Sequence, residues 1–202
     1  KLIILYILNK FLMKHLLLLI LCISFFSCKQ EEKPKEIPTD SIFQLTSTWE
    51  NQHNDSLQLK DLQGKTLVVV MIYTTCKFAC PILVADMKKI EKQIKPSNLK
   101  DVSMVLVSID PKTDTPERLA EFAKTSGMEA DHWVFLRSNE ADTQEFANVL
   151  AMKYKKISPV DFSHSNIISI FNKEGKLIMQ EEGLEIDVAK VAGEVNELAN
   201  SS

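Results

Sequence analysis

The strongest constraint on the fold is a run of β-branched and apolar residues, TLVVVMIY at positions 66–73. A continuous apolar run of this length is typical of a strand that is buried on both faces of a sheet. The next segment, residues 81–94, has the spacing of an amphipathic helix. The apolar stripe of this helix is predicted to contain Ile82, Leu83, Met87, Ile90 and Ile94. We therefore expect a central strand followed by a helix that covers it.

The same alternation of strand and helix repeats further along the chain. Residues 102–109, VSMVLVSI, predict a second buried strand. A second helix is expected to begin after Thr115, its N-cap, with Pro116 at the first helical position. It runs through Lys124, and Gly127 terminates it. Successive strand-helix units of this kind favour a mostly parallel sheet.

The remainder of the chain predicts a third unit, a hairpin and a closing helix. Residues 132–136 are a strand candidate and residues 141–154 a helix candidate. Residues 167–180 predict two strands around a turn at 172–175. The last helix is expected at 187–200. The hairpin adds an antiparallel edge to the sheet.

The predicted order β-α-β-α-β-α-β-β-α indicates an α/β protein with a thioredoxin-like three-layer fold, in which helices flank a central mixed sheet. Residues 42–66 add two short strands or a hairpin as an N-terminal extension. A length of 202 residues suits one domain with a substantial core, plus extra segments. In this fold the turn after the strand at 66–73 carries Cys76 and Cys80.

The N-terminal segment MKHLLLLILCISFFSC, residues 13–28, has the proportions of an export signal. Its apolar core, residues 16–26, is shorter than the roughly 20 residues that span a bilayer. We expect Met13 to be the true start and residues 1–27 to be a signal peptide, with residues 1–12 an over-extended reading frame. If residues 1–12 are translated, an uncleaved anchor is the alternative.

Cys28 follows the sequence FFS and resembles the lipidated cysteine of bacterial lipoproteins, with Phe25 where a leucine is usual. The resemblance implies cleavage before Cys28 and a lipid on its sulfur, and the alternative is a fortuitous cysteine at the end of the signal. Residues 28–40 are charged and contain prolines, so they predict a lipidated, flexible tether ahead of a domain at 41–202. The expected location is the bacterial cell envelope, on the extracytoplasmic side of a membrane.

The charge and the cysteines of the mature chain limit its function. Removal of residues 1–27 takes away three lysines and no acid, so the formal charge falls from −3 to −6. An acidic chain without a basic cluster is not expected to bind nucleic acid. Cys22 leaves with the signal and Cys28 carries the lipid, so Cys76 and Cys80 are the free thiols of the domain. Outside the cytosol such a pair is a structural disulfide, a redox couple or a metal site.

Cys76 and Cys80 have a spacing that permits both redox and metal chemistry. Residues four apart on a helix share one face, with about 6 Å between Cα atoms, which a disulfide can bridge. The N-terminus of a helix lowers the pKa of a cysteine in its first turn, and the thiolate is the form that attacks disulfides and binds soft metals. Three intervening residues also allow the two sulfur atoms to stand apart around an ion.

Two thiolates are too few for a closed metal site, so a third ligand is needed. Of His53, His132 and His164, only His164 is well placed, in a loop just before the predicted strand that starts at Ile167. Two thiolates suit Cu(I), and an added imidazole lets Cu(II) bind too. The residues by themselves leave three alternatives open, which are a copper site, a redox-active dithiol and a structural pair.

Three segments resemble motifs of the Sco (SenC) family. They are CKFACP at 76–81, VSIDPKTDTPERLAEFAK at 107–124 and SHSNIISIFNKEG at 163–175, and the resemblance covers residues 40–200. It implies a membrane-tethered, thioredoxin-fold protein that binds copper, as Cu(I) and Cu(II), through Cys76, Cys80 and His164. Many members have an aspartate directly before the histidine, where this chain has Ser163.

The resemblance also implies a role in assembling the dinuclear copper site of a respiratory cytochrome c oxidase. The protein would deliver copper to that site or keep its cysteines reduced. Its partners would be the copper-containing oxidase subunit and a copper donor or thiol reductant. The alternative is an envelope thiol-disulfide oxidoreductase that uses Cys76 and Cys80 as a redox-active catalytic pair without metal. A peroxidase is the weakest reading, because no peroxidatic motif matches.

Several other residues have more ordinary explanations. Asp110 and Asp114 are expected to serve the turn and the helix cap, and His53 and His132 to be solvated. Three methionines are expected to pack in the core, namely Met71, Met87 and Met104. Phe78, between the two cysteines, either shields the site or presents it to a partner.

Overall fold

The computed structural model describes residues 37–158 and 161–201, together with positions 3, 6, 10, 13 and 14. The chain divides into two compact units, residues 1–36 and 37–202. The few described positions of the first unit are helical and exposed. The rest of the predicted signal peptide, Cys28 and its predicted lipidation lie outside the described residues. Within the described part, no helix is both long and apolar enough to cross a membrane.

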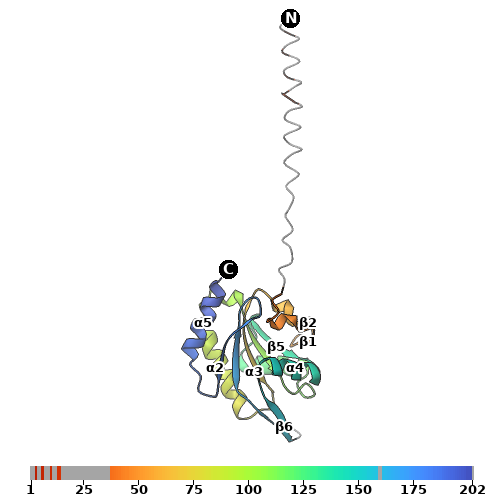
Figure 1. Cartoon of the computed structure of the whole chain (residues 1–202), viewed down its shortest axis with the longest axis vertical. Helices are drawn as coiled ribbons and strands as arrows, with labels where there is room; N and C mark the ends of the chain where they lie inside the picture. Colours follow the sequence, from red (N-terminus) through yellow and green to blue (C-terminus); the bar gives the residue numbers. More distant parts are fainter. Residues whose placement is uncertain are drawn as a thin grey trace. The chain divides into compact units, whose positions relative to one another are not determined.

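A mixed sheet of seven strands forms the centre of the domain, in the order β2-β1-β5-β4-β3-β8-β9 (Figure 1). The strands of this sheet are β1 (Thr48–Asn51), β2 (Ser56–Gln58), β3 (Thr66–Ile72), β4 (Val102–Ser108), β5 (Trp133–Arg137), β8 (Ile167–Phe171) and β9 (Leu177–Glu182). Strands β3, β4 and β5 are parallel, and the strands added on both sides are antiparallel. The predicted α/β fold with a central mixed sheet and an N-terminal hairpin is therefore confirmed.

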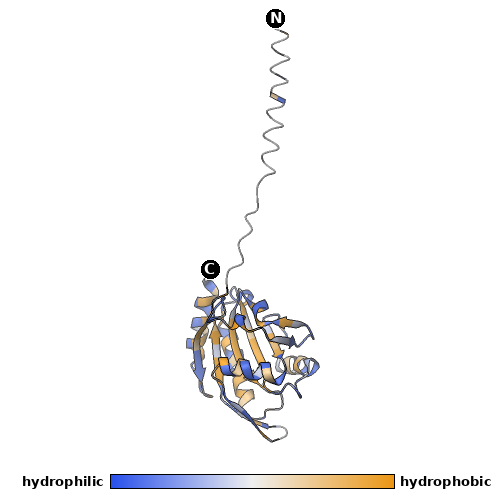
Figure 2. Ribbon diagram, turned by 45° about the vertical axis from the view of Figure 1, so that its right-hand side comes forward, coloured by the Kyte–Doolittle hydropathy of each residue, from blue (hydrophilic) through white to orange (hydrophobic). Residues whose placement is uncertain are grey.

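Four helices flank the sheet, and they are α2 (Ala79–Gln93), α3 (Pro116–Ser126), α4 (Glu140–Val149) and α5 (Val188–Asn200). Helix α2 packs beside α5, whereas α3 contacts β5 and β1. Three short 3-10 turns complete the domain, namely η1 (Ile42–Gln44), η2 (Leu59–Leu62) and η3 (Leu99–Asp101). Figure 2 shows that hydrophobic residues concentrate in the strands of the central sheet, and that hydrophilic residues are frequent on the helices.

The two central strands position the loops that matter for function. Every residue of β3 and β4 is buried, as their apolar runs predict. They pair in parallel from Thr66 opposite Val102 to Ile72 opposite Ser108, so they end at the same edge of the sheet. The loops that follow them, residues 73–78 and 109–115, therefore meet at this edge. In open α/β sheets, ligand sites lie at the carboxyl ends of the strands.

Helix α2 differs from its prediction in one residue of its apolar stripe. Leu83, Met87, Ile90 and Ile94 are buried, but Ile82 is 39% exposed. Position 82 is rotated by about 100° from Leu83 around the helix axis, away from the stripe that faces the core. The helix also begins at Ala79, two residues earlier than predicted.

Helix α3 agrees closely with its prediction. The Thr115 side chain caps it by accepting a hydrogen bond from the backbone N–H of Arg118, and Pro116 occupies the first turn. The helix continues to Ser126, and Gly127 ends it in the left-handed conformation with φ of 65°. The cap and the terminator predicted from the sequence are both confirmed.

The prediction for residues 141–154 is wrong in its second half. Helix α4 ends at Val149, because Ala151 takes a positive φ of 53°. A two-stranded antiparallel hairpin follows, formed by β6 (Tyr154–Ser158) and β7 (Asp161–His164). The sequence did not predict this hairpin, since its exposed residues lack the apolar alternation of a strand that packs on a core. His164 is the last residue of β7 and not part of a loop.

The hydrophobic core of the described residues lies in the second unit. All described core residues lie between Ile42 and Ala199. Large aromatic side chains extend it beneath the N-terminal hairpin, where the rings of Trp49 and Phe146 pack edge to face at 5.5 Å. Residues 37–202 thus carry a complete core of their own and are expected to fold without the first 36 residues.

Candidate metal centre

Cys76 and Cys80 lie where β3 passes into α2. Cys76 belongs to the loop, and Cys80 stands in the first turn of the helix. The expectation that both cysteines share a helical face is therefore wrong, since Cys76 precedes the helix. The backbone N–H of Cys80 donates to the Cys76 sulfur at 3.3 Å. The helix N-terminus thus directs one of its unpaired N–H groups at the Cys76 sulfur.

The structure brings Cys76, Cys80 and His164 together. One ligand atom from each side chain lies within 4.8 Å of the other two. The Cys80 sulfur is 3.9 Å from Nε2 of His164, although the two residues are 84 positions apart in the sequence. In the described part of the chain, no other group of three histidine, cysteine or acidic side chains is close enough to hold a metal ion.

The imidazole of His164 has a defined orientation and tautomer. Its Nδ1 lies 3.0 Å from the backbone carbonyl oxygen of Ser165. A carbonyl only accepts hydrogen bonds, so Nδ1 carries the proton and Nε2 keeps a free lone pair that faces Cys80. The Tyr73 ring packs edge to face against the imidazole, with centroids 5.8 Å apart. A backbone carbonyl thus orients the ring, as the outer partners of metal-binding histidines do.

The nearest acid, Asp161, has a different role. Its carboxylate accepts a hydrogen bond from the Tyr73 hydroxyl. Burial, followed by this hydrogen bond, raises the pKa of Tyr73 well above its ordinary value. Tyr73 therefore stays neutral and acts as a donor beside the cysteine pair. Asp161 thus anchors the tyrosine, and it is the carbonyl of Ser165, not an acid, that orients the imidazole.

The two thiols differ in exposure and in acidity. Burial acts to raise the pKa of Cys76, but hydrogen bonds from the backbone N–H groups of Cys80 and Phe78 outweigh it and lower the pKa. Cys76 is only partly buried, whereas Cys80 is 2% exposed. Burial raises the pKa of Cys80 far above the ordinary thiol value, and the nearby Cys76 adds to the rise. Cys76 is consequently the accessible nucleophile and Cys80 the protected partner.

Asp114 holds the cysteine loop in place. The sequence predicted only a turn or capping role for this residue and missed its contact with the loop. Its buried carboxylate accepts hydrogen bonds from the Ser108 hydroxyl at 2.6 Å and from both the backbone N–H and the hydroxyl of Thr74. Arg118 lies 3.8 Å from the same carboxylate. Asp114 therefore connects the end of β4 and helix α3 to the residue two positions before Cys76. Burial raises its pKa despite these hydrogen bonds.

The other residues singled out in the sequence lie away from this centre or beside it. Asp110 serves the turn as expected, because its carbonyl accepts from the N–H groups of Thr113 and Asp114. The prediction that His132 is solvated is wrong, because its Nε2 lies 2.6 Å from the Glu91 carboxylate. The three methionines pack in the core as predicted, and they are Met71, Met87 and Met104. Phe78 is 81% exposed.

The fold and this site define a thioredoxin-like domain with a thiol pair and a facing histidine. A model of the SCO1/SenC family matches residues 31–200, so the chain belongs to that family. Among curated relatives, the SCO1 homologue of Bacillus subtilis is 28% identical over 141 residues, which is 68% of this chain and 72% of the relative.

Solved structures of the family share the fold. A SCO1/SenC family lipoprotein of Bacillus anthracis is 25% identical with a TM-score of 0.71, over 83% of this chain and 100% of the other. BsSco, described as a member of the Sco family of cytochrome c oxidase assembly proteins with a disulfide switch, is 25% identical with a TM-score of 0.70, over 84% and 100%. Copper-bound ScoI of Arabidopsis thaliana is 20% identical with a TM-score of 0.66, over 75% and 94%.

Proposed function

We propose that this chain binds copper through Cys76, Cys80 and His164 and uses it to assemble the dinuclear copper site of a respiratory cytochrome c oxidase. The observation that carries the proposal is the approach of two thiols and one imidazole nitrogen to within 4.8 Å. The copper-bound structure of the Arabidopsis relative and the assembly role ascribed to BsSco support it.

The donor set fits copper better than the hard cations. Thiolates and imidazole select soft or borderline metals, and no carboxylate belongs to the cluster among the described residues. Two thiolates suit Cu(I), and the free Nε2 of His164 supplies the nitrogen ligand that Cu(II) favours. The three residues would therefore hold copper in either oxidation state.

The accessibility of the two cysteines suggests how copper is handed over. Cys80 is the buried ligand, whereas Cys76 and His164 are half-buried, so Cys76 is the sulfur that a partner can reach. Because the pKa of Cys76 is lowered, a larger fraction of this thiol is ionised at a given pH than of an ordinary cysteine, which reduces the proton cost of binding copper. A partner thiol that replaces Cys76 first would open the site for transfer.

A second function, reduction of the cysteines of the client oxidase, is favoured by the contrast between the two thiols. A partly exposed Cys76 with a lowered pKa and a buried Cys80 with a raised pKa are suited to attack and resolution in thiol-disulfide exchange. The disulfide switch described for BsSco supports this reading. Under it the same pair acts as a redox-active dithiol, and His164 is dispensable.

The location is part of the proposal. We propose that residues 1–27 are a signal peptide, that Cys28 carries a lipid, and that residues 28–40 tether the domain of residues 41–202 to the extracytoplasmic side of a membrane. The existence of a SCO1/SenC family lipoprotein in Bacillus anthracis supports this arrangement. Tethering would keep the copper site close to a membrane-bound oxidase.

The proposal is tested in a bacterium whose copy of this gene has been deleted. We expect loss of cytochrome c oxidase activity, restored by the wild-type chain but not by Cys76→Ser, Cys80→Ser or His164→Ala. The copper content of the isolated oxidase is measured in parallel. Full restoration by His164→Ala, with failure of both cysteine variants, would replace copper delivery by thiol reduction. Normal oxidase activity in the deletion strain would contradict both functions.

A further inference from the structure

Two adjoining cavities extend from the cysteine pair, the first between α2 and α3 and the second along α3 and the loops that carry Thr74 and Thr113. The first, of about 410 Å³, is lined by Cys76 and Cys80, by Val84 and Lys88 of α2, and by Phe122 of α3. The second, of about 640 Å³, shares Phe122 with the first and extends to Thr74 and Arg118. We call these two cavities the α2–α3 groove. It is the hollow through which a second molecule can reach the Cys76 sulfur from the side of α3.

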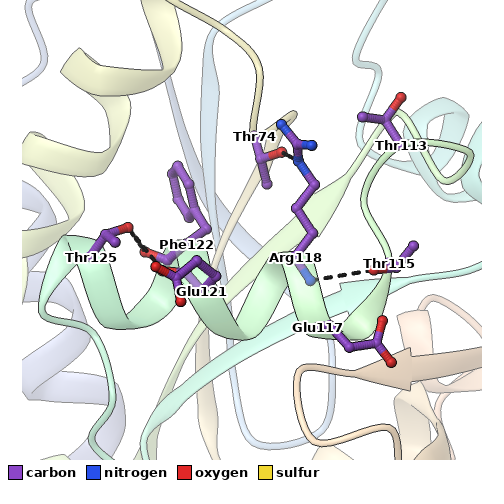
Figure 3. Close-up of a pocket in the computed structure, with 8 residues that line it drawn as sticks. All are labelled: Thr74, Thr113, Thr115, Glu117, Arg118, Glu121, Phe122 and Thr125. Carbon is purple, nitrogen blue, oxygen red and sulfur yellow. Dashed lines mark hydrogen bonds between the residues drawn. The ribbon is translucent and has the colours of Figure 1, made fainter.

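Arg118 gives the groove a fixed cationic group. Its Nε donates to the Thr74 hydroxyl at 2.7 Å, and the Thr74 hydroxyl in turn donates to the buried carboxylate of Asp114. Figure 3 shows the guanidinium rising from α3 beside Thr74. Its two terminal amino groups donate no hydrogen bond to the described part of the chain, and its side chain is 47% exposed. A guanidinium held in this way offers a fork of donors that matches a carboxylate.

The other charges of the groove are mixed, but neither of its two acids forms an ion pair with Arg118, whose one ion pair within the described residues is with Asp114. Lys88, at the far end of the first cavity, is a second cation. Glu117 and Glu121 also line the second cavity, but Glu117 lies on the opposite side of α3 from Arg118 (Figure 3). Arg118 bonds the residue two positions before Cys76, so the guanidinium lies within reach of a short segment whose thiol meets Cys76.

Phe78 adds an apolar contact at the same place. It stands between the two cysteines in the sequence, and its side chain is 81% exposed. Ile82, one helical turn further along α2, is 39% exposed. Inside the groove, Val84 and Phe122 provide further apolar surface. A large aromatic side chain exposed beside a reactive site is typical of a surface that a partner covers.

We propose that the α2–α3 groove binds an extended, cysteine-bearing segment of the partner protein that carries a carboxylate close to its cysteine. The carboxylate pairs with Arg118, an apolar side chain packs against Phe78, and the partner's sulfur meets Cys76. This inference deepens the proposed function, because it names the surface and the chemistry by which the client is recognised. It applies to copper transfer and to thiol reduction alike.

The thiol step provides a direct assay that needs no copper. In a peptide whose cysteine is activated as a mixed disulfide with thionitrobenzoate, the Cys76 thiolate attacks the peptide sulfur. A new disulfide joins Cys76 to the peptide, and thionitrobenzoate leaves with the electron pair of the broken bond. Cys80 can then attack the Cys76 sulfur, release the reduced peptide thiol and lose its proton. The pair thereby supplies the two electrons that reduce the peptide.

The test uses residues 37–202, reduced and metal-free, because Cys76 and Cys80 are the only cysteines of this fragment. Two blocked hexapeptides differ only in a Glu or a Gln two residues from the activated cysteine, and thionitrobenzoate release gives the rates. We expect the Glu peptide to react about three- to five-fold faster, with the difference fading at high salt. Arg118→Gln should abolish this preference, so that the two peptides react at equal rates.

The controls separate recognition from disturbance of the loop. Lys124→Gln makes the same charge change on another side of α3 and should keep the preference for the Glu peptide. Phe78→Ser should slow both peptides by a similar factor without changing the rate with iodoacetamide.

Equal rates of the two peptides with the wild-type fragment would overturn the proposal. So would an equal slowing of both peptides by Arg118→Gln, because Arg118 would then only order the loop. Peptide rates unaffected by Phe78→Ser would remove the apolar contact. A failure of copper binding would leave all these rates unchanged, so the two proposals can fail separately.

Discussion

At the scale of single residues, the site depends on backbone groups as much as on side chains. The carbonyl of Ser165 fixes the tautomer of His164, and the N–H of Cys80 contacts the Cys76 sulfur. A sequence motif shows neither contact, because any residue type supplies the same carbonyl and N–H. The cysteines and the histidine could be selected from the sequence, whereas the difference between the two thiols required the structure.

The difference between the thiols leads to a prediction about alkylation. In the reduced 37–202 fragment, iodoacetamide should modify Cys76 at least about ten times faster than Cys80, since Cys80 is buried and its pKa is raised. The pKa of Cys76 is lowered, so its rate should reach half of its maximum at a lower pH than the rate of an ordinary thiol, which does so at about pH 8.5. Mass spectrometry of quenched samples measures both rates.

Unfolding the fragment in urea is the control, because it should equalise the two cysteines. Equal labelling in the folded state, or faster labelling of Cys80, would contradict the assignment of Cys76 as the accessible thiol.

Asp114 supports a prediction about the loop that carries Cys76. Asp114→Asn replaces an acceptor oxygen by an amide donor that faces the donors of Ser108 and Thr74. We expect the free energy of unfolding to fall by about 1–3 kcal/mol, the cost of leaving a buried polar group unpaired. Urea denaturation measures it. Asp131→Asn, at an exposed position, should change stability by less than about 0.5 kcal/mol.

At the scale of elements, strands with uninterrupted apolar runs and helices with strong caps could be predicted, and the β6–β7 hairpin could not. Strands β3 and β4 are buried over their whole length, and α3 has Thr115 and Gly127 at its two ends. The hairpin is stabilised by pairing with itself and by rings such as Tyr73 against Phe162, at 5.1 Å between centroids. Contacts of this kind between distant segments leave no periodic signal in the sequence.

The turn between β8 and β9 supplies a prediction on stability. Gly175 has φ of 76°, and a Cβ there would lie 2.5 Å from the Ser41 hydroxyl and 2.7 Å from the Phe43 ring. Gly64 has φ of 88° with open space around it. Gly64→Ala should cost about 1–2 kcal/mol for its backbone conformation alone.

Gly175→Ala should lower the free energy of unfolding by about 1–3 kcal/mol more than Gly64→Ala does, because its methyl group also overlaps η1. The difference between the two variants in urea denaturation isolates the contact with η1. Equal destabilisation by both variants would show that η1 gives way easily and does not pack tightly against the turn.

At the scale of the whole molecule, the site is built where three distant segments meet at one edge of the sheet. The loop after β3 brings the cysteines, the loop after β4 brings Asp114, and the end of β7 brings His164. The sequence predicted a mostly parallel sheet, and the structure shows that β3 and β4 are parallel neighbours, so the loops after them meet at one edge. His164 was selected from its position just before the predicted strand at 167, and the family resemblance supported it, but nothing in the local sequence fixes its distance from Cys80.

The most direct test of the central claim is a copper titration of the reduced 37–202 fragment under anaerobic conditions. Cu(I) and then Cu(II) are added while thiolate-to-Cu(II) charge-transfer absorbance is recorded, for the wild type and for His164→Ala, with His53→Ala as the matched control. We predict one tightly bound equivalent in each oxidation state, with the Cu(II) signal lost only in His164→Ala. Absence of stoichiometric copper, or oxidation of the pair to a disulfide without a charge-transfer band, would contradict the claim that these three residues form a copper site.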